Sequence, residues 1–388
     1  MTLPCGTRGF STFRGISAVF QTARLAVLGH GTYTARVIDT ESKLAGFLEN
    51  LRAATWVAVD TEADSLHAYP EKVCLIQVST VAGDELVDPL SEINLAPFLE
   101  TLGGHELLMH GADYDLRLLE KHHRFIPASI FDTMLAARLI GEPHFGYSAL
   151  VEKFLGVKLE KGPQKANWAM RPLTERMAQY ARNDTHYLKP LVERLKTTLA
   201  EKGRLTWQQE SCARLIADCT QPRPDDSDSA WRIKGSHLLG RPALAVLREL
   251  WRWRESEAIA ANRPPFFVMN HEALVNMAAA AAAQLPVEPL VPKHLSERRR
   301  GGVSAAIARG LAVPPENHPL FPERTSQRPT AAEHKRSLEL QKIRDRHAQE
   351  LGIDPTLIAS RATLFELARV WEQHAPQLMN WQRELLKA

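Results

Sequence analysis

The sequence is poor in cysteine, and no cysteine lies in a pattern typical of a metal site or a disulfide framework. Its 388 residues contain four, Cys5, Cys74, Cys212 and Cys219. No two of them form a C-x-x-C pair and no Cys/His cluster has zinc-ligand spacing, which excludes a zinc finger and a small disulfide-stapled scaffold. This cysteine usage fits a reduced, cytoplasmic compartment.

A long apolar run and a large excess of charge of one sign are also missing. No apolar run is long enough to span a bilayer, so we expect a soluble chain with no membrane segment. The formal net charge is +3 and the pI is about 8.6. This mild excess permits a nucleic-acid partner without arguing for one, because binding depends on basic residues that gather on one face.

What is present is the composition of globular domains, with 44% apolar and 24% charged residues. A chain of this length is expected to form two or three domains. Residues 1–35 stand apart, because no acidic residue precedes Asp39 while Arg8, Arg14 and Arg24 lie among Ser and Thr. That composition resembles an organellar transit peptide. Glycine and proline interrupt any long amphipathic helix there, so we favour a poorly structured extension or a start codon placed too far upstream.

Apolar periodicity from residue 36 onward predicts an α/β domain, which we place at residues 36–218. The later part of the chain predicts only helix and loop. Residues 244–261 and 337–351 form equivalent amphipathic patterns, each followed by a proline-containing loop and a helix rich in Leu and Ala. This weak repeat predicts two small helical domains. We place them at 236–312 and 330–388, with linkers at 219–235 and 313–329.

The sharpest chemical signal is a pair of carboxylates, Asp60 and Glu62, at the end of an apolar strand predicted at residues 56–62. Side chains two apart on a strand point to the same face. Two acids against a hydrophobic strand are costly unless a cation neutralises them, and oxygen ligands favour Mg²⁺ or Mn²⁺. The alternative is a polar strand end that meets solvent, and this motif alone leaves the two nearly even.

Two weaker signals follow later in the chain. Thr174 is placed to cap a helix on which Tyr180 and Asp184, four residues apart, share a face. Alone, such a pair usually reflects packing and solvation. Where a strand turns into a helix, Asp113 is placed as an N-cap and Asp115 lies in the first turn, where a carboxylate can face the sheet.

Together these motifs resemble the DEDD exonuclease superfamily. The tyrosine four residues before the last aspartate is typical of its DEDDy branch, whereas the sister branch has histidine five residues before it, where Gln179 stands here. Many members carry Asn in place of His110. Further segments are similar to bacterial ribonuclease D, and the helical repeats resemble HRDC domains, so that the likeness covers roughly nine-tenths of the chain. These segments are Leu75-Ile76-Gln77, Phe131-Asp132-Thr133, residues 161–168, residues 171–175 and, in the second repeat, residues 357–361.

The resemblance implies a ribonuclease H-like mixed sheet flanked by helices, followed by two all-α HRDC-type domains. It implies a metal-dependent 3′→5′ exoribonuclease that releases nucleoside 5′-monophosphates with the help of two divalent ions, Mg²⁺ or Mn²⁺. RNA is the implied partner, above all transfer RNA precursors with 3′ extensions. We expect no obligate protein partner. The alternatives are a single-stranded DNA 3′→5′ exonuclease and a non-catalytic RNA-binding protein with a degenerate exonuclease fold.

By the same resemblance, Asp60 would bridge both ions. Glu62 and Asp184 would complete the site of the ion that binds the attacking water, and Asp115 would hold the second ion largely through water. Tyr180 would orient the attacking water. A phenol with an ordinary pKa of about 10 is a poor base, so we assign it orientation rather than deprotonation.

Substrate contacts are expected in the loop before the Tyr180 helix. Lys161, Lys165 and Trp168 are candidates for phosphate contact and base stacking. The alternative is a solvated loop with Trp168 packed on the domain. His110 is a further candidate contact or a structural group.

Other charged and aromatic residues have simpler readings. Asp64, Asp132 and His186 are expected to be structural, with Asp132 as a helix cap. Basic residues of the helical repeats are candidates for RNA-backbone contacts, with solvated helix faces as the equal alternative. They are Arg248, Arg252, Arg254, Arg298, Arg299, Arg300, Lys342, Arg344 and Arg361. Trp251, Trp253 and Trp381 are expected in cores.

Overall fold

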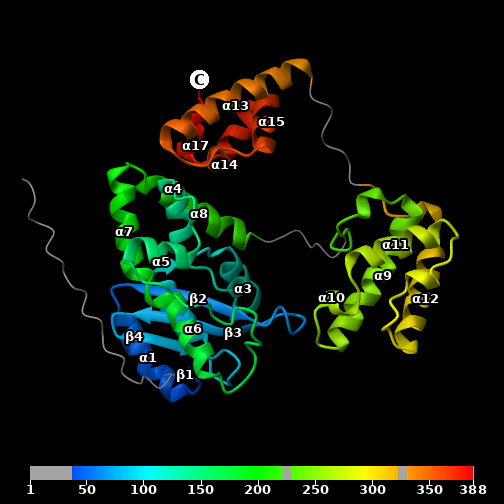
Figure 1. Ribbon diagram of the computed structural model, residues 1–388, viewed down its shortest axis with the longest axis horizontal. Coiled ribbons are helices and arrows are strands. Elements are labelled where there is room, and N and C mark those ends of the chain that lie inside the picture. Colours follow the sequence, from blue (N-terminus) through cyan, green and yellow to red (C-terminus); the bar gives the residue numbers. More distant parts are fainter. Residues whose placement is uncertain (1–36, 222–228, 322–329, 388) are drawn as a thin grey trace, which may run out of the picture. The chain divides into compact units, whose positions relative to one another are not determined.

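The computed structural model describes residues 37–221, 229–321 and 330–387 (Figure 1). We refer to these stretches as the sheet domain, the first helical unit and the second helical unit, and describe each by itself. The extension predicted at residues 1–35 lies outside the described residues.

The sheet domain contains a mixed sheet of six strands in its described residues, in the order β1-β4-β3-β2-β5-β6. Strands β2, β3 and β4 pair antiparallel, whereas β1 with β4, β2 with β5 and β5 with β6 pair parallel. The strands are β1 Val37–Ile38, β2 Val57–Ala63, β3 Val73–Thr80, β4 Gly83–Val87, β5 Glu106–Met109 and β6 Ser129–Asp132. The expected mixed sheet flanked by helices is confirmed.

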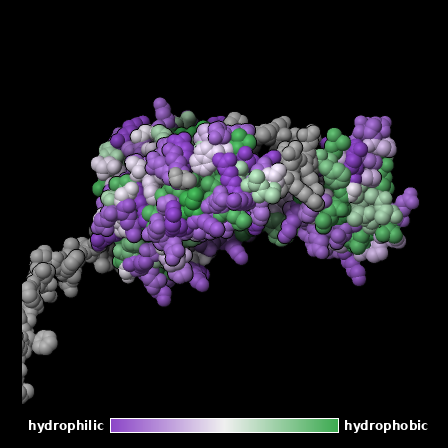
Figure 2. All heavy atoms as spheres, turned by 90° about the horizontal axis from the view of Figure 1, so that it is seen from above, coloured by the Kyte–Doolittle hydropathy of each residue, from purple (hydrophilic) through white to green (hydrophobic). Residues whose placement is uncertain are grey.

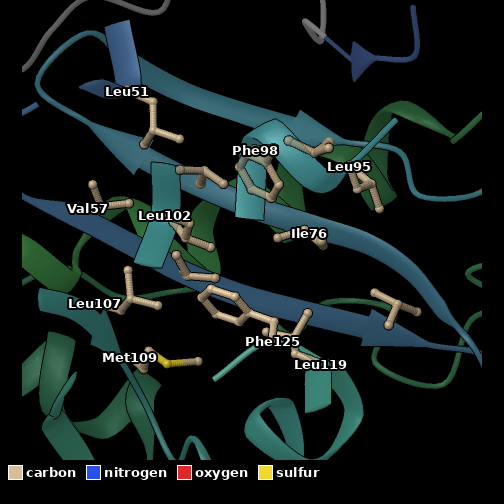
Figure 3. Close-up of a cluster of buried hydrophobic side chains, with 14 of the residues drawn as sticks. Leu51, Val57, Ile76, Leu95, Phe98, Leu102, Leu107, Met109, Leu119 and Phe125 are labelled. Atoms are coloured by element: carbon tan, nitrogen blue, oxygen red, sulfur yellow. The ribbon is translucent and has the colours of Figure 1, made fainter. Parts of the chain in front are cut away.

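One face of the sheet is covered by helices α1, α2 and α3. Their apolar side chains, among them Leu51, Phe98 and Leu119, form one core with Val57 and Ile76 of the central strands (Figure 3). Every residue of β3 is buried, so both sides of this strand are covered. The helices are α1 Glu41–Ala53, α2 Ala96–Gly103 and α3 Asp113–His123.

The opposite face is covered by α4, α5, α6 and α7, and α8 packs beside β6. Ala58 of β2 joins a core with Leu150 and Leu191 on that side, because alternate strand residues point to opposite faces. In Figure 1, α6 crosses in front of β2 and β3. These helices are α4 Thr133–Ile140, α5 Tyr147–Leu155, α6 Glu175–His186, α7 Leu188–Glu201 and α8 Leu205–Thr220.

Local capping explains several helix starts. Asp132 accepts from the backbone N–H groups of Met134 and Leu135, and Thr174 accepts from that of Met177, which confirms both predicted caps. The prediction for Asp113 was wrong. Helix α3 has Ala112 as its N-cap residue and Asp113 as its first residue.

Asp113 is displaced from the cap position by two contacts. The backbone N–H of Ala112 donates to the buried carboxylate of Asp132 at 2.8 Å. The Asp113 carboxylate instead pairs with Arg117 one turn later, at 3.0 and 3.1 Å. The helix therefore starts one residue earlier than a cap at Asp113 requires.

The two helical units repeat one arrangement, as the sequence predicted. In each, a long helix is followed by a four-residue helix that starts at a proline and then by a helix capped by a side chain, from Asn270 in the first unit and Ser360 in the second. The first unit contains α9 Arg241–Ala260, α10 Pro265–Val268, α11 His271–Ala282 and α12 Glu297–Leu311, with turns η2 Ser236–Leu238, η3 Glu288–Leu290 and η4 Pro315–Asn317. The second contains α13 Ala331–Leu351, α14 Pro355–Ile358, α15 Arg361–Arg369, α16 Trp371–His374 and α17 Asn380–Leu386, with turn η5 Ala375–Gln377.

The boundaries around the first helical unit differ from those predicted. Helix α8 runs through Thr220, past the expected domain end at residue 218. Trp231 and Ile233, expected in a linker, are buried in the core of the first helical unit. Arg241 donates to the carbonyls of Pro315 and His318, so residues past 312 also belong to this unit. Composition alone did not reveal the contacts of Arg241, because they join residues more than seventy positions apart.

Figure 2 shows a face on which hydrophilic residues predominate and apolar residues form separate patches. Within the described stretches, no helix combines the length and the apolar composition that crossing a membrane requires.

Candidate active site

Strand β2 presents the first two acids on one face. Asp60 and Glu62 are two residues apart, and Asp60 lies opposite Gln77 of β3 in the antiparallel register. Helix α6 packs against β2 and β3 and carries Asp184. One carboxylate oxygen each from Asp60, Glu62 and Asp184 lies within 4.8 Å of the others. Strand β2 and helix α6 therefore bring three carboxylates together at one point, and all three residues are half-buried.

The fourth acid, Asp115, is buried on α3 beside this group. Its carboxylate accepts hydrogen bonds from the backbone N–H of Thr61 at 3.1 Å and from the Thr61 hydroxyl at 2.5 Å. Thr61 stands between Asp60 and Glu62, so it links α3 to the acidic strand end. The structure thus brings three of the four expected acids into one cluster and holds the fourth through the residue between two of them.

The electrostatics of the cluster are unfavourable for four ionised acids. Burial, followed by the charges of Asp115, Asp184 and Glu62, raises the pKa of Asp60 well above its usual value. Burial and the neighbouring aspartates raise the pKa of Glu62 to about 9. Burial also raises the pKa of Asp184 to about 7 and that of Asp115 to about 6.

In the described stretches, no lysine, arginine or histidine forms an ion pair with these acids. A group of carboxylates without a protein cation is stabilised by a bound metal ion. Its donors are all carboxylate oxygens, which suit hard divalent ions such as Mg²⁺ or Mn²⁺. The residues therefore fit a divalent-metal site.

Tyr180 lies one turn before Asp184 on α6, so the two side chains share one face of the helix. Burial and the charge of Asp184 raise the pKa of the Tyr180 phenol above its usual value, against a hydrogen bond from Gln164. The phenol therefore keeps its proton at neutral pH. It is suited to orient a water molecule and unsuited to deprotonate one.

The loop before α6 packs directly on the Tyr180 ring. A Cβ added at Gly162 would lie 1.5 Å from the Cδ2 atom of Tyr180, so only glycine fits this backbone position without a shift. The ring centroids of Trp168 and Tyr180 are 6.1 Å apart, and Trp168 is only 1% exposed. This burial excludes Trp168 from stacking on a base. The alternative reading, packing on the domain, is the one the structure supports.

Arg171 anchors the same loop to the sheet. Its guanidinium forms a two-pronged bridge to the buried Asp88, at 2.5 and 2.6 Å, and donates to the carbonyls of Cys74 and Trp168. The sequence reading missed Arg171, Gly162 and Gln164 as supports of Tyr180. The only available signal was that residues 161–168 and 171–175 belong to the family-like segments, which assigned them no contacts.

The remaining candidate contacts divide into exposed and structural residues. Lys161 and Lys165 are exposed in the Tyr180-covering loop, where a phosphate can reach them. His110 is half-buried, bonded to the Thr133 hydroxyl at 2.9 Å, and its ring centroid lies 5.4 Å from that of Tyr147. Burial lowers the pKa of His110, so it is neutral at pH 7 and held in a structural position.

The residues expected to be structural are so. Asp64 is buried and bonded to the backbone and side chain of Lys72. His186 pairs with Asp84 at 2.7 Å. Trp253 and Trp381 are buried, and Trp251 packs against the core of the first helical unit. None of these residues is in the acidic cluster.

Several arginines proposed for RNA contact are already engaged. Arg254 is 3% exposed and donates to Glu255 and to the Met269 carbonyl, so the prediction that it contacts RNA was wrong. Arg344 likewise bonds Asp345 and the Ala359 carbonyl. Further partners are carboxylates for Arg252, Arg298 and Arg299 and backbone carbonyls for Arg300. These arginines bond groups of their own unit, which sequence periodicity alone did not reveal.

Comparison with known proteins gives matches over the same regions. A family model described as a 3′→5′ exonuclease matches residues 35–200, and one for the HRDC domain matches residues 243–285. Ribonuclease D of Gluconacetobacter diazotrophicus is 30% identical over 356 residues, which cover 89% of each chain. Ribonuclease D of Pseudomonas paraeruginosa is 30% identical over 361 residues, 89% of this chain and 94% of that protein.

Solved structures agree in fold. Escherichia coli RNase D has a TM-score of 0.72 at 24% identity, covering 91% of this chain and 96% of its own. The catalytic core of RRP6 from Trypanosoma brucei has a TM-score of 0.60 at 28% identity, covering 73% and 80%.

The exonuclease match spans the strands and the helix that carry the acidic cluster, and on this basis the protein is a 3′→5′ exonuclease. The ribonucleases D share 30% of their residues with it along most of both chains, so the chain belongs to the ribonuclease D family. It is a 3′→5′ exoribonuclease, and its fold is an exonuclease sheet domain followed by a helical HRDC region.

Proposed function

We propose that this exoribonuclease trims the 3′ ends of transfer RNA precursors with two divalent ions, Mg²⁺ or Mn²⁺. The ions would be held by Asp60, Glu62, Asp115 and Asp184. The observation that carries the proposal is the cluster of carboxylate oxygens within 4.8 Å whose pKa values burial and mutual repulsion raise.

The positions of the four acids suggest which ion each would hold. Asp60 is central, because the charges of the other three acids all act on it, and we assign it to both ions. Glu62 and Asp184 complete one site. Asp115, already engaged by Thr61, is suited to hold the other ion through water. When bound, such ions activate water and neutralise the charge that develops on the leaving oxygen.

Tyr180 would orient the attacking water. Its raised pKa keeps the hydroxyl protonated, and the contacts with Gly162 and Trp168 hold the ring over the cluster. Lys161 and Lys165, exposed in the same loop, would contact the phosphates of the 3′-terminal strand. Family membership supports RNA as the substrate, and a cytoplasmic location follows as part of this proposal.

The test is a single-turnover assay on a 3′-extended transfer RNA and a single-stranded DNA of matched sequence, with EDTA, Mg²⁺ or Mn²⁺. We expect stepwise shortening of the RNA only when metal is present, and slower loss of the DNA. Preference for the DNA would favour the alternative substrate. Shortening in excess EDTA would contradict the metal mechanism.

A pair of variants on α3 tests the assignment of Asp115. We expect Asp115→Asn to lower kcat roughly 100-fold or more, because it weakens an ion site. Asp113→Asn is the matched control: it lies two residues earlier, pairs with Arg117 and should keep wild-type kcat. Equal rates for the two variants would remove Asp115 from the site.

A further inference from the structure

Gln77 is a buried polar residue that the mechanism above does not use. It lies in the middle of β3 and its side chain is fully buried, at 0% exposure. Neither its amide nitrogen nor its amide oxygen has a hydrogen-bond partner in the part of the chain that the structure describes. Burying an unpaired amide costs free energy, so a buried glutamine is expected to have a hydrogen-bond partner.

The register places Gln77 beside the acidic cluster. It pairs with Asp60 across the antiparallel β2–β3 ladder, and residues directly opposite in such a ladder project to the same face as neighbours. Its side chain therefore lies next to the one acid on which the charges of all the others converge, although its amide forms no hydrogen bond with that acid in the structure.

Helix α6 closes this face over Gln77. Leu75, two residues earlier, packs in one cluster with Ala178 and Ala181 of α6. Ser79, two residues later, bonds the Thr185 hydroxyl at 2.7 Å. Gln77 is thus held between two contacts to the helix that carries Asp184, and it cannot turn to solvent.

An amide suits this position chemically. Its N–H groups can donate to a carboxylate, whereas it brings no positive charge that would compete with a divalent ion for the acids. A lysine or arginine there would neutralise the cluster, and an apolar residue could donate no hydrogen bond to the carboxylate.

We propose that Gln77 is a positioning residue of the catalytic site: its amide, which bonds no group in the described structure, turns to the Asp60 carboxylate and orients it when ions bind. The inference rests on the proposed metal mechanism and adds to it a support from the neighbouring strand. Removal of a side chain that orients a metal ligand typically lowers metal affinity or activity roughly 10- to 100-fold.

The test replaces Gln77 with methionine, which has a similar length and shape but no hydrogen-bonding amide. We expect Gln77→Met to fold with a melting temperature at or above that of the wild type, because an unpaired buried amide has been removed. Its kcat should fall roughly 10- to 100-fold with KM for RNA unchanged. Its affinity for Mn²⁺, measured by calorimetry without RNA, should fall by a similar factor.

Ile76→Val is the matched control, since Ile76 is the preceding residue and faces the opposite core (Figure 3). It should lose some stability and keep wild-type kcat and Mn²⁺ affinity. If Gln77→Met fails to fold, Gln77→Leu provides the same measurements.

The outcomes are separable. Wild-type kcat and Mn²⁺ affinity in the folded Gln77→Met variant would overturn this inference alone. The unpaired amide would then have no role in ion binding or catalysis. Failure of the unsubstituted chain to bind Mn²⁺ would overturn the proposed function, and this inference with it.

Discussion

At the scale of single residues, the site is defined by acids whose charged form is destabilised by burial and by neighbouring carboxylates. Glu62 is the clearest case, because burial and two neighbouring aspartates raise its pKa to about 9. In an unfolded chain a glutamate titrates near pH 4.3, as a typical value. The folded, metal-free protein therefore binds the Glu62 proton more tightly than the unfolded chain does.

This difference makes the stability of the metal-free protein depend on pH. Because the folded pKa is the higher one, the stabilisation from Glu62 is fully present below the unfolded pKa and is lost as pH rises towards about 9. We expect Glu62→Gln to flatten this decline between pH 5 and 9, measured as urea unfolding of the sheet domain in EDTA. An equally steep decline in the variant would show that Glu62 does not titrate as described.

Asp60 should show the conflict between stability and function most directly. Asp60→Asn removes a carboxylate whose pKa burial and three neighbouring acids raise, so the metal-free variant should melt at a higher temperature than the wild type at pH 8. Its kcat should fall roughly 100-fold or more. A variant that is both less stable and fully active would contradict the assignment.

At the scale of elements, α6 and the loop before it form the support of Tyr180. The loop contributes the glycine against the ring, the buried Trp168 and the Arg171 bridge to Asp88. Helix α6 contributes the spacing that brings Tyr180 to Asp184. Neither element positions the phenol alone, so a change in the loop should act on catalysis.

Gly162→Ala is the most specific change of this kind. The added methyl group would overlap the Tyr180 ring and displace it, which should lower kcat roughly 10- to 100-fold. Gly46→Ala in α1 is the control, because a Cβ there meets nothing within 4 Å and kcat should be unchanged. Single-turnover rates and near-ultraviolet circular dichroism measure both effects. Unchanged kcat in Gly162→Ala would show that the loop can move aside without cost.

At the scale of the whole molecule, basic and acidic residues nearly balance, with 48 lysines and arginines against 45 aspartates and glutamates. The net charge is only +3. Many arginines of the helical units bond carboxylates or carbonyls of their own unit. RNA affinity should therefore depend strongly on exposed lysines near the catalytic cluster.

The salt dependence of RNA binding tests this distribution. We expect the double substitution Lys161→Gln and Lys165→Gln to weaken binding and to reduce the slope of log affinity against log salt by roughly 0.7 for each lost contact. Arg254→Gln should lower the stability of the first helical unit and leave that slope unchanged, because Arg254 is buried. The reverse pattern would assign RNA binding to the helical unit.

The sequence by itself determined the features that follow from local periodicity. Asp60 and Glu62 share a face because strand side chains alternate, and Tyr180 reaches Asp184 because a helix repeats every four residues or so. Caps at Asp132 and Thr174 and the repeated helical arrangement follow from similarly local signals.

Only the tertiary structure decided what depends on distant neighbours. Thr61 holds Asp115, Asp132 displaces Asp113 from its cap, and Trp168 is buried against Tyr180. Gln77 faces Asp60 because two strands pair in one register out of several that their composition allows. Such contacts join residues far apart in the chain, and no spacing within a motif contains that information.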